Sequence, residues 1–128
     1  MSRSSQILGH KAELYACAFL LRQGNTIYAR NYRFRGGEID IVAQTPHGTW
    51  LFVEVKSVAH PHMGNPNRRI GFSKQERIWR TAVHYLHFHG GTDQPSRFDV
   101  IALDYRRGIA RIAYYPNAFE GSRSVPIC

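Results

Sequence analysis

The sequence is poor in cysteine and in acidic residues, and it contains no long apolar run. Only two cysteines occur in 128 residues, so neither a disulfide framework nor a structural zinc site is indicated. No segment approaches the roughly 20 apolar residues that a membrane-spanning helix needs. The first six residues are polar and are not followed by the apolar core of a signal peptide. We therefore expect a cytoplasmic protein with no membrane partner.

Basic residues outnumber acidic ones by 17 to 9, which gives a formal net charge of +8 and a pI near 10.0. An excess of this size favours a polyanionic partner. Nucleic acid is the first candidate for this partner. The chain is long enough for one packed core and too short for two. We expect a single domain over residues 1–128, with residues 1–6 and 116–128 loosely ordered.

Hydrophobic periodicity predicts two helices and five strands in the order α-β-β-β-α-β-β. The first helix is expected over residues 7–23, with two apolar strips that would leave it well buried. The second is expected from Ser73, which forms a capping-box pattern with Glu76. Strands are expected over residues 26–34, in the two acidic segments discussed next, and over residues 97–103 and 109–115. This order is typical of an α/β sandwich in which helices flank a central mixed sheet.

Asp40 and Glu54 each interrupt an apolar segment that has the alternation of a strand. Residues 45–49, between these segments, have the composition of a short hairpin loop. The loop sets a register in which Asp40 faces Glu54 and Glu38 faces Lys56. Because side chains alternate along a strand, all four would then lie on the same side of the sheet. A charge in a half-buried strand is costly unless it is paired or ligated, so the two acids need a partner.

Two interpretations of the acids are open from geometry alone. In the first, a divalent cation lies between Asp40 and Glu54 and removes a repulsion that would destabilise the sheet. Mg²⁺ is suited to this, because proteins commonly hold it with one or two carboxylates, waters and a substrate phosphate. In the second, Glu38 pairs with Lys56 on an exposed ladder and the two acids are solvated. A slip of one residue would place the acids on opposite faces.

The motifs around these acids resemble those of a known family. The similarity is to the YraN-like bacterial family of uncharacterised proteins, and it covers roughly residues 7–103. The matching positions are Glu13, residues 30–33, 37–40 and 52–56, Lys74, and residues 97–100. That family in turn resembles the PD-(D/E)XK nuclease superfamily, particularly the archaeal Holliday-junction resolvases. The signature's leading proline is absent here.

The resemblance implies a restriction-endonuclease-like fold and a metal-dependent endonuclease acting on branched or structured DNA. It implies catalytic roles for Asp40, Glu54, Lys56 and Glu13, with Asp40, Glu54 and the Val55 carbonyl as ligands of Mg²⁺ or Mn²⁺. Lys56 would orient the attacking water or stabilise charge on the phosphate, and Glu13 would hold a second metal or a metal-bound water. Without the resemblance, Glu13 is interpreted as an exposed helix charge. Related resolvases act as dimers, so a homodimer is also implied.

Several basic residues are suited to phosphate contacts, which position a nucleic acid without reading its sequence. Each alone is typical of a solvated surface, but their joint excess indicates a binding function. The candidates are Arg33, Arg35, Arg68, Arg69, Lys74, Arg77 and Arg80. An alternative function is therefore a nucleic-acid-binding module that keeps the nuclease fold and has little or no turnover.

Three further features have structural interpretations. We expect Trp79 to lie in the core and Asp99 to brace the sheet or an arginine. His84 and His87 are neighbours on the second helix, but no cysteine or nearby carboxylate completes a zinc-like ligand set. We therefore expect no metal site at these histidines.

Overall fold

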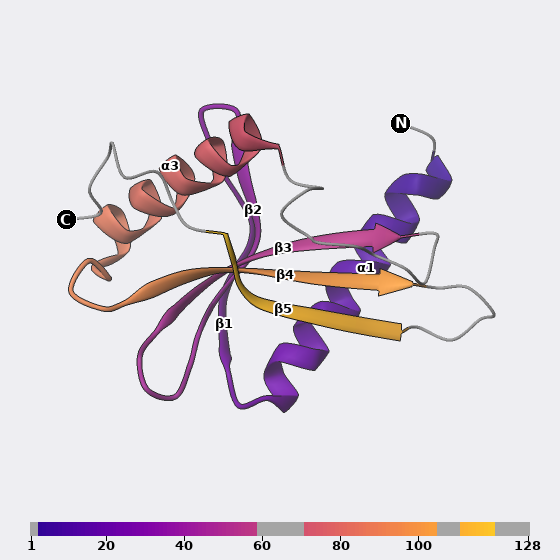
Figure 1. Ribbon diagram of the computed structural model, residues 1–128, viewed down its shortest axis with the longest axis horizontal. Helices are drawn as coiled ribbons and strands as arrows, with labels where there is room; N and C mark the ends of the chain where they lie inside the picture. The colour runs from indigo at the N-terminus through magenta and orange to yellow at the C-terminus, as the bar shows by residue number, and fades with distance from the viewer. Residues whose placement is uncertain (1–2, 59–70, 105–110, 120–128) are drawn as a thin grey trace.

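The structure is a computed structural model that describes residues 3–58, 71–104 and 111–119, in which two helices flank a five-stranded sheet (Figure 1). The elements are α1 (Arg3–Arg22), β1 (Thr26–Phe34), β2 (Gly37–Gln44), β3 (Trp50–Val58), α3 (Phe72–His89), β4 (Ser96–Asp104) and β5 (Arg111–Phe119). The predicted order α-β-β-β-α-β-β is confirmed. The architecture is consistent with a restriction-endonuclease-like sandwich.

The strands lie in the sheet in their chain order, from β1 to β5. β3 and β4 are parallel, and the other neighbouring pairs are antiparallel. Parallel neighbours require a crossover connection, and the chain between β3 and β4 contains α3. The sheet is therefore mixed, as predicted, and its parallel pair lies in the middle part of the molecule.

The two helices cover opposite faces of the sheet (Figure 1). Strand alternation separates the core accordingly. Val42 and Phe52 contribute to the layer beneath α3, whereas Ile41 and Val53 contribute to the layer beneath α1. Trp79 is 3% exposed in the α3 layer, which confirms its predicted place in the core. Neither described helix is both long enough and apolar enough to cross a bilayer.

Within residues 10–22 of α1, whose burial the structure describes, one narrow stripe is fully buried, so the expectation of a well-buried helix with two apolar strips was wrong there. Ala12, Ala16 and Leu20 are at most 1% exposed and follow the i, i+4, i+8 spacing of one helix face. Leu14 and Leu21, from the second strip, are 47% and 56% exposed. Because the two alanines lack bulk, the buried contact of α1 with the sheet stays narrow.

The start of α3 differs from the predicted capping box. The helix begins at Phe72, and Gly71 occupies the N-cap position without a side-chain cap. The Gln75 amide donates to the Gly71 carbonyl at 3.0 Å, so the first helical hydrogen bond begins two residues before Ser73. Ser73 therefore lies inside the first turn. The helix ends, as expected, at Gly90, which adopts a left-handed conformation with φ 76°.

Asp99 is fully buried in β4 and is held by a complete set of donors. Its carboxylate accepts from Arg97 Nε at 3.0 Å, from the Asn117 amide at 2.9 Å and from the Tyr114 hydroxyl. Burial, followed by the hydrogen bond to Asp99, raises the pKa of Tyr114 to about 12. The prediction that Asp99 braces the sheet or an arginine is confirmed, since it does both.

The anchoring of Asn117 also corrects the expected end of the last strand. β5 includes residues 116–119, although the strand was expected to end at residue 115. Ala118 and Phe119 are both 6% exposed and belong to the core beneath α3. Residues 120–128 lie outside the described residues. The sequence signal was weak because the burial pattern of β5 does not alternate regularly.

We predict that Asp99→Ala lowers the free energy of unfolding by about 3 kcal/mol, because it leaves a buried ion pair without its acid. Glu76→Ala is the matched control, since Glu76 forms a surface ion pair with Arg80 at 3.5 Å. Its loss should cost under about 0.5 kcal/mol. Urea unfolding of both variants measures the difference, and equal losses would contradict the bracing role.

Candidate functional site

Strands β2 and β3 separate at Asp40. Their antiparallel pairing places Val42 opposite Phe52, as the hairpin loop predicted, and it ends at the pair of Ile41 with Val53. Beyond that pair, Asp40 Oδ2 accepts a hydrogen bond from the Val55 amide at 2.8 Å. A side chain of β2 thus replaces a backbone carbonyl as the acceptor for β3, and the backbone of β2 is free to turn away.

The separation alters the expected partners of Glu38 and Lys56. In the observed register, Glu38 lies opposite Arg33 of β1, and Lys56 lies opposite Ala102 of β4. Glu38 Oε1 is 3.5 Å from Arg33 Nε. The expected strand pairing of Glu38 with Lys56 was therefore wrong, because β2 has already left β3 at this level.

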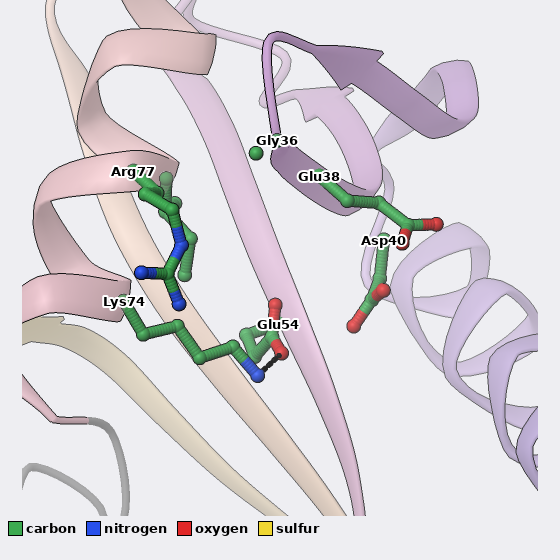
Figure 2. A pocket seen from close by; sticks show the side chains of 8 residues that line it. Gly36, Glu38, Asp40, Glu54, Lys74 and Arg77 are labelled. Atoms are coloured by element: carbon green, nitrogen blue, oxygen red, sulfur yellow. Dashed lines mark ion pairs between the residues drawn. The ribbon is translucent and has the colours of Figure 1, made fainter. Parts of the chain in front are cut away.

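A cavity of about 210 Å³ lies where the strands separate, beside the first turns of α3. Figure 2 shows Glu54 between Asp40, from β2, and the basic side chains of Lys74 and Arg77, from α3. Glu38 points away from Glu54 in the same view. The described residues that line the cavity are Gly36, Gly37, Glu38, Asp40, Glu54, Lys74, Arg77 and Ile78. The two acids predicted to face one another therefore do share a cavity.

Glu54 is nearly buried, at 7% exposure, and has a cationic partner from another element. Lys74 Nζ lies 2.7 Å from Glu54 Oε1 (Figure 2). The lysine side chain remains 43% exposed, so its ammonium reaches into the cavity from the solvent side. Lys74 was predicted as a phosphate contact, and the structure places it directly against a predicted catalytic acid.

Asp40 lies among other acids and has little compensation for its charge. Burial and then the neighbouring Glu54 raise its pKa to about 8, and Glu13 and Glu38 add to the rise. The hydrogen bond from the Val55 amide acts in the opposite direction. The carboxyl therefore holds a proton more readily than an ordinary aspartate. Negative charge at this position is unfavourable unless a cation approaches.

Glu13 and Lys56 are not among the described residues that line the cavity. Glu13, on α1, affects Asp40 electrostatically, and its Oε1 is buried without a hydrogen bond, 3.7 Å from Arg30. Lys56 is half-buried on β3, two residues beyond Glu54. Within residues 3–58, 71–104 and 111–119, no three His, Cys, Asp or Glu side chains are grouped as a ready-made metal site.

The predicted phosphate contacts are distributed over several surroundings. Arg77 is exposed and lines the cavity. Arg33 is 76% exposed beside Glu38, and the Arg35 guanidinium lies over the Phe34 ring, 5.2 Å from its centroid. Arg68 and Arg69 lie outside the described residues. The structure therefore brings Lys74 and Arg77 to the acids and places Arg33 and Arg35 at the β1–β2 turn.

The importance of Gly37 was missed from the sequence. A Cβ atom at this position would lie 2.7 Å from the Arg77 carbonyl oxygen and would also collide with Thr81 Oγ1. Only glycine therefore allows α3 to lie this close to β2 and to present Arg77 to the cavity. The adjacent pair Gly36–Gly37, directly before the acidic segment, was the available signal.

We predict that Gly37→Ala destabilises the protein by about 1–3 kcal/mol, because α3 must move to relieve the overlap. Gly71→Ala is a suitable control, since a Cβ there would meet nothing within 4 Å. Thermal unfolding of the two variants compares the effects. A Gly37→Ala protein with unchanged stability would contradict the close packing.

The raised pKa of Asp40 predicts an unusual dependence of stability on pH. Between its ordinary value of 3.8 and about 8, the folded protein binds more protons than the unfolded chain. This contribution to the free energy of unfolding is present below pH 3.8 and is lost as pH rises to about 8. The loss is at most about 1.4 kcal/mol per pH unit for one proton. Urea unfolding in EDTA should show this slope in the wild type relative to Asp40→Asn, and parallel pH profiles would contradict it.

The sequence profile of the uncharacterised protein family UPF0102 matches residues 12–103. The UPF0102 protein of Geobacter metallireducens is 40% identical over 120 residues, covering 94% of this chain and 98% of the relative. The UPF0102 protein of Anaeromyxobacter dehalogenans is 37% identical over 116 residues, covering 91% and 86%.

Among solved structures, Pyrococcus furiosus SfsA in complex with Ca²⁺ is similar, with a TM-score of 0.41 and 12% sequence identity. The match covers 92% of this chain and 65% of SfsA, so this chain spans less than two thirds of that protein.

Proposed function

The chain belongs to the uncharacterised protein family UPF0102, and we propose that it is a metal-dependent endonuclease that hydrolyses phosphodiester bonds in branched or otherwise structured DNA. The observation that carries this proposal is the placement of Asp40 and Glu54 on one cavity. Two acids would repel an anionic ligand, so binding alone gives no reason for them. Their presence in a chain of net charge +8 supports phosphodiester chemistry assisted by a cation.

The donors around the cavity fit a hard cation. Asp40 and Glu54 offer carboxylate oxygens, and we propose the Val55 carbonyl as a further ligand of Mg²⁺ or Mn²⁺. The Lys74 ammonium, 2.7 Å from Glu54, supports this fit because it is itself a cation at the same carboxylate. A bound divalent ion would polarise a phosphoryl oxygen and lower the pKa of a coordinated water.

The basic residues of the site would bind and orient the phosphate. Lys74 and Arg77 reach the cavity from α3, opposite Asp40, so a phosphate between them would meet donors on one side and the metal-binding acids on the other (Figure 2). Lys56 would stabilise charge that develops on the phosphate. Glu13, which already influences Asp40, would hold a water molecule at the edge of the site.

We predict Mn²⁺-dependent cleavage when linear, flap and four-way DNA substrates are compared in a gel assay. Glu54→Gln and Asp40→Asn should each lower the rate by about 100-fold or more, because each removes a charged oxygen ligand. Lys56→Met should slow cleavage while leaving metal binding intact. Glu76→Gln is the matched control, since this acid pairs with Arg80 on the surface and does not line the cavity.

The possible results separate the candidate functions. Cleavage that persists in Glu54→Gln would place the activity at another site or in a contaminant. Tight, salt-sensitive DNA binding without cleavage in Mg²⁺ or Mn²⁺ would favour the alternative of a binding module with a nuclease fold. Calorimetric titration of Mn²⁺ into wild type and Asp40→Asn tests the metal site independently of any substrate.

A further inference from the structure

A second cavity, of about 410 Å³, lies between α3 and the end of β1. Its described lining combines aromatic, aliphatic and basic side chains and contains no acid: Phe34, Arg80, Val83, His84, His87 and Phe88. The volume falls in the range of cavities that hold small organic groups. Phe88 is 74% exposed at this cavity, so a large apolar ring faces solvent where it could instead contact a ligand.

The aromatic part of this cavity is already ordered. The His84 ring stacks on Phe34 with centroids 3.7 Å apart and an interplanar angle of 15°. His84 also lies 4.6 Å from the Phe88 ring, and its Nδ1 forms a hydrogen bond of 2.7 Å with the Tyr32 hydroxyl. Because Tyr32 fixes His84 and His84 supports both phenyl rings, the surface is organised before any ligand arrives.

Positive charge surrounds these rings. Arg35 lies over Phe34, and Arg80 lines the cavity, with Glu76 as an ion-pair partner at 3.5 Å. Arg77, three residues before Arg80 on α3, lines the acidic cavity described above. Residues three apart on a helix are surface neighbours. The two arginines therefore connect the acidic cavity to the aromatic one along a single helix.

We infer that the aromatic cavity binds an unpaired base of a nucleic acid whose phosphates pass along Arg80 and Arg77. Every base has a π face, and proteins bind single strands by stacking bases on aromatic rings beside basic groups. The connection between this base site and cleavage at the acidic cavity rests on the proposed function. A base held here would place the adjoining backbone near the acidic cavity, which gives preference to DNA with unpaired nucleotides at a branch.

A second copy of the chain is a less favourable occupant. A twofold contact brings the same surface patch of both copies together. Arg35 would then approach its own counterpart. The described lining contains no acid, and the nearby Glu76 is already paired with Arg80. A nucleic acid instead provides both a ring for the aromatic side chains and negative charge for the arginines.

The test is binding of a dye-labelled single-stranded DNA and of a fully paired, blunt-ended duplex with the same number of nucleotides in total, measured by fluorescence anisotropy in EDTA. Phe88→Ala should weaken single-strand binding about tenfold and leave duplex binding within about twofold. Phe88→Tyr should retain the affinity, whereas Phe88→Leu should not. Phe72→Ala is the matched control, because Phe72 is 77% exposed on the same helix and lines neither described cavity.

Unchanged single-strand affinity in Phe88→Ala, or an equal loss for both DNAs, would overturn the inference. Sedimentation velocity tests the other occupant: a dimer lost in Phe88→Ala without loss of single-strand affinity would assign the surface to self-association. The assay contains no metal and records no cleavage, so it is independent of catalysis. If the cleavage assay shows no activity but Phe88→Ala still weakens single-strand binding, the nuclease proposal alone is rejected. If cleavage is observed but Phe88→Ala leaves single-strand binding unchanged, the base site alone is rejected.

Discussion

The candidate site depends on the hydrogen bond from the Val55 amide to the Asp40 carboxylate. It lies where the β2–β3 ladder ends, and it satisfies a β3 donor that would otherwise lose its partner. The strands can therefore separate without leaving this backbone group unpaired. The space between them is completed by α3, whose close approach requires Gly37. One side-chain acceptor thus allows a cavity to exist inside a hydrogen-bonded sheet.

Asp40, which is half-buried, and Asp99, which is fully buried, lie in the same sheet but have opposite electrostatic surroundings. Asp99 receives donors from Arg97, Tyr114 and Asn117, so its charge is balanced and its role is to hold β4 to β5. Asp40 receives one amide and has Glu54 as its strongest charged neighbour. A balanced acid stabilises a fold, whereas an unbalanced acid at a cavity has capacity for a further cation. This difference distinguishes a structural aspartate from a candidate catalytic one.

The parts of the fold and site that were predictable from sequence are those fixed by local geometry. Loop residues 45–49 determined the register that pairs Val42 with Phe52, and the apolar periods determined the element order. The end of the β2–β3 ladder was not predictable, because a side-chain hydrogen bond of Asp40 replaces the backbone ladder there and the adjoining cavity is completed by α3, far along the chain. For the same reason the ion pair of Lys74 with Glu54 had no sequence signal beyond the family pattern.

The predicted cap at Ser73 shows how a local motif can mislead. Its spacing to Glu76 is correct for a capping box, yet the hydrogen bond of Gln75 to Gly71 starts the helix earlier. The aromatic cavity was missed for a different reason. Phe34 and Phe88 belong to unrelated amphipathic patterns, and they meet on one surface in the fold, where His84 contacts both rings.

The hydrogen bond from the Asn117 amide to Asp99 also affects the outer edge of the sheet. β5 is an edge strand, and such strands can recruit a strand from another molecule through their unpaired amides and carbonyls. Here Pro116 has no amide hydrogen, Asn117 turns its amide inward to Asp99, and its φ of 53° interrupts the extended backbone. At residues 116–117 the edge therefore offers no regular template for strand addition. The interaction that secures the last described strand thus also shortens the stretch of β5 that another strand could join.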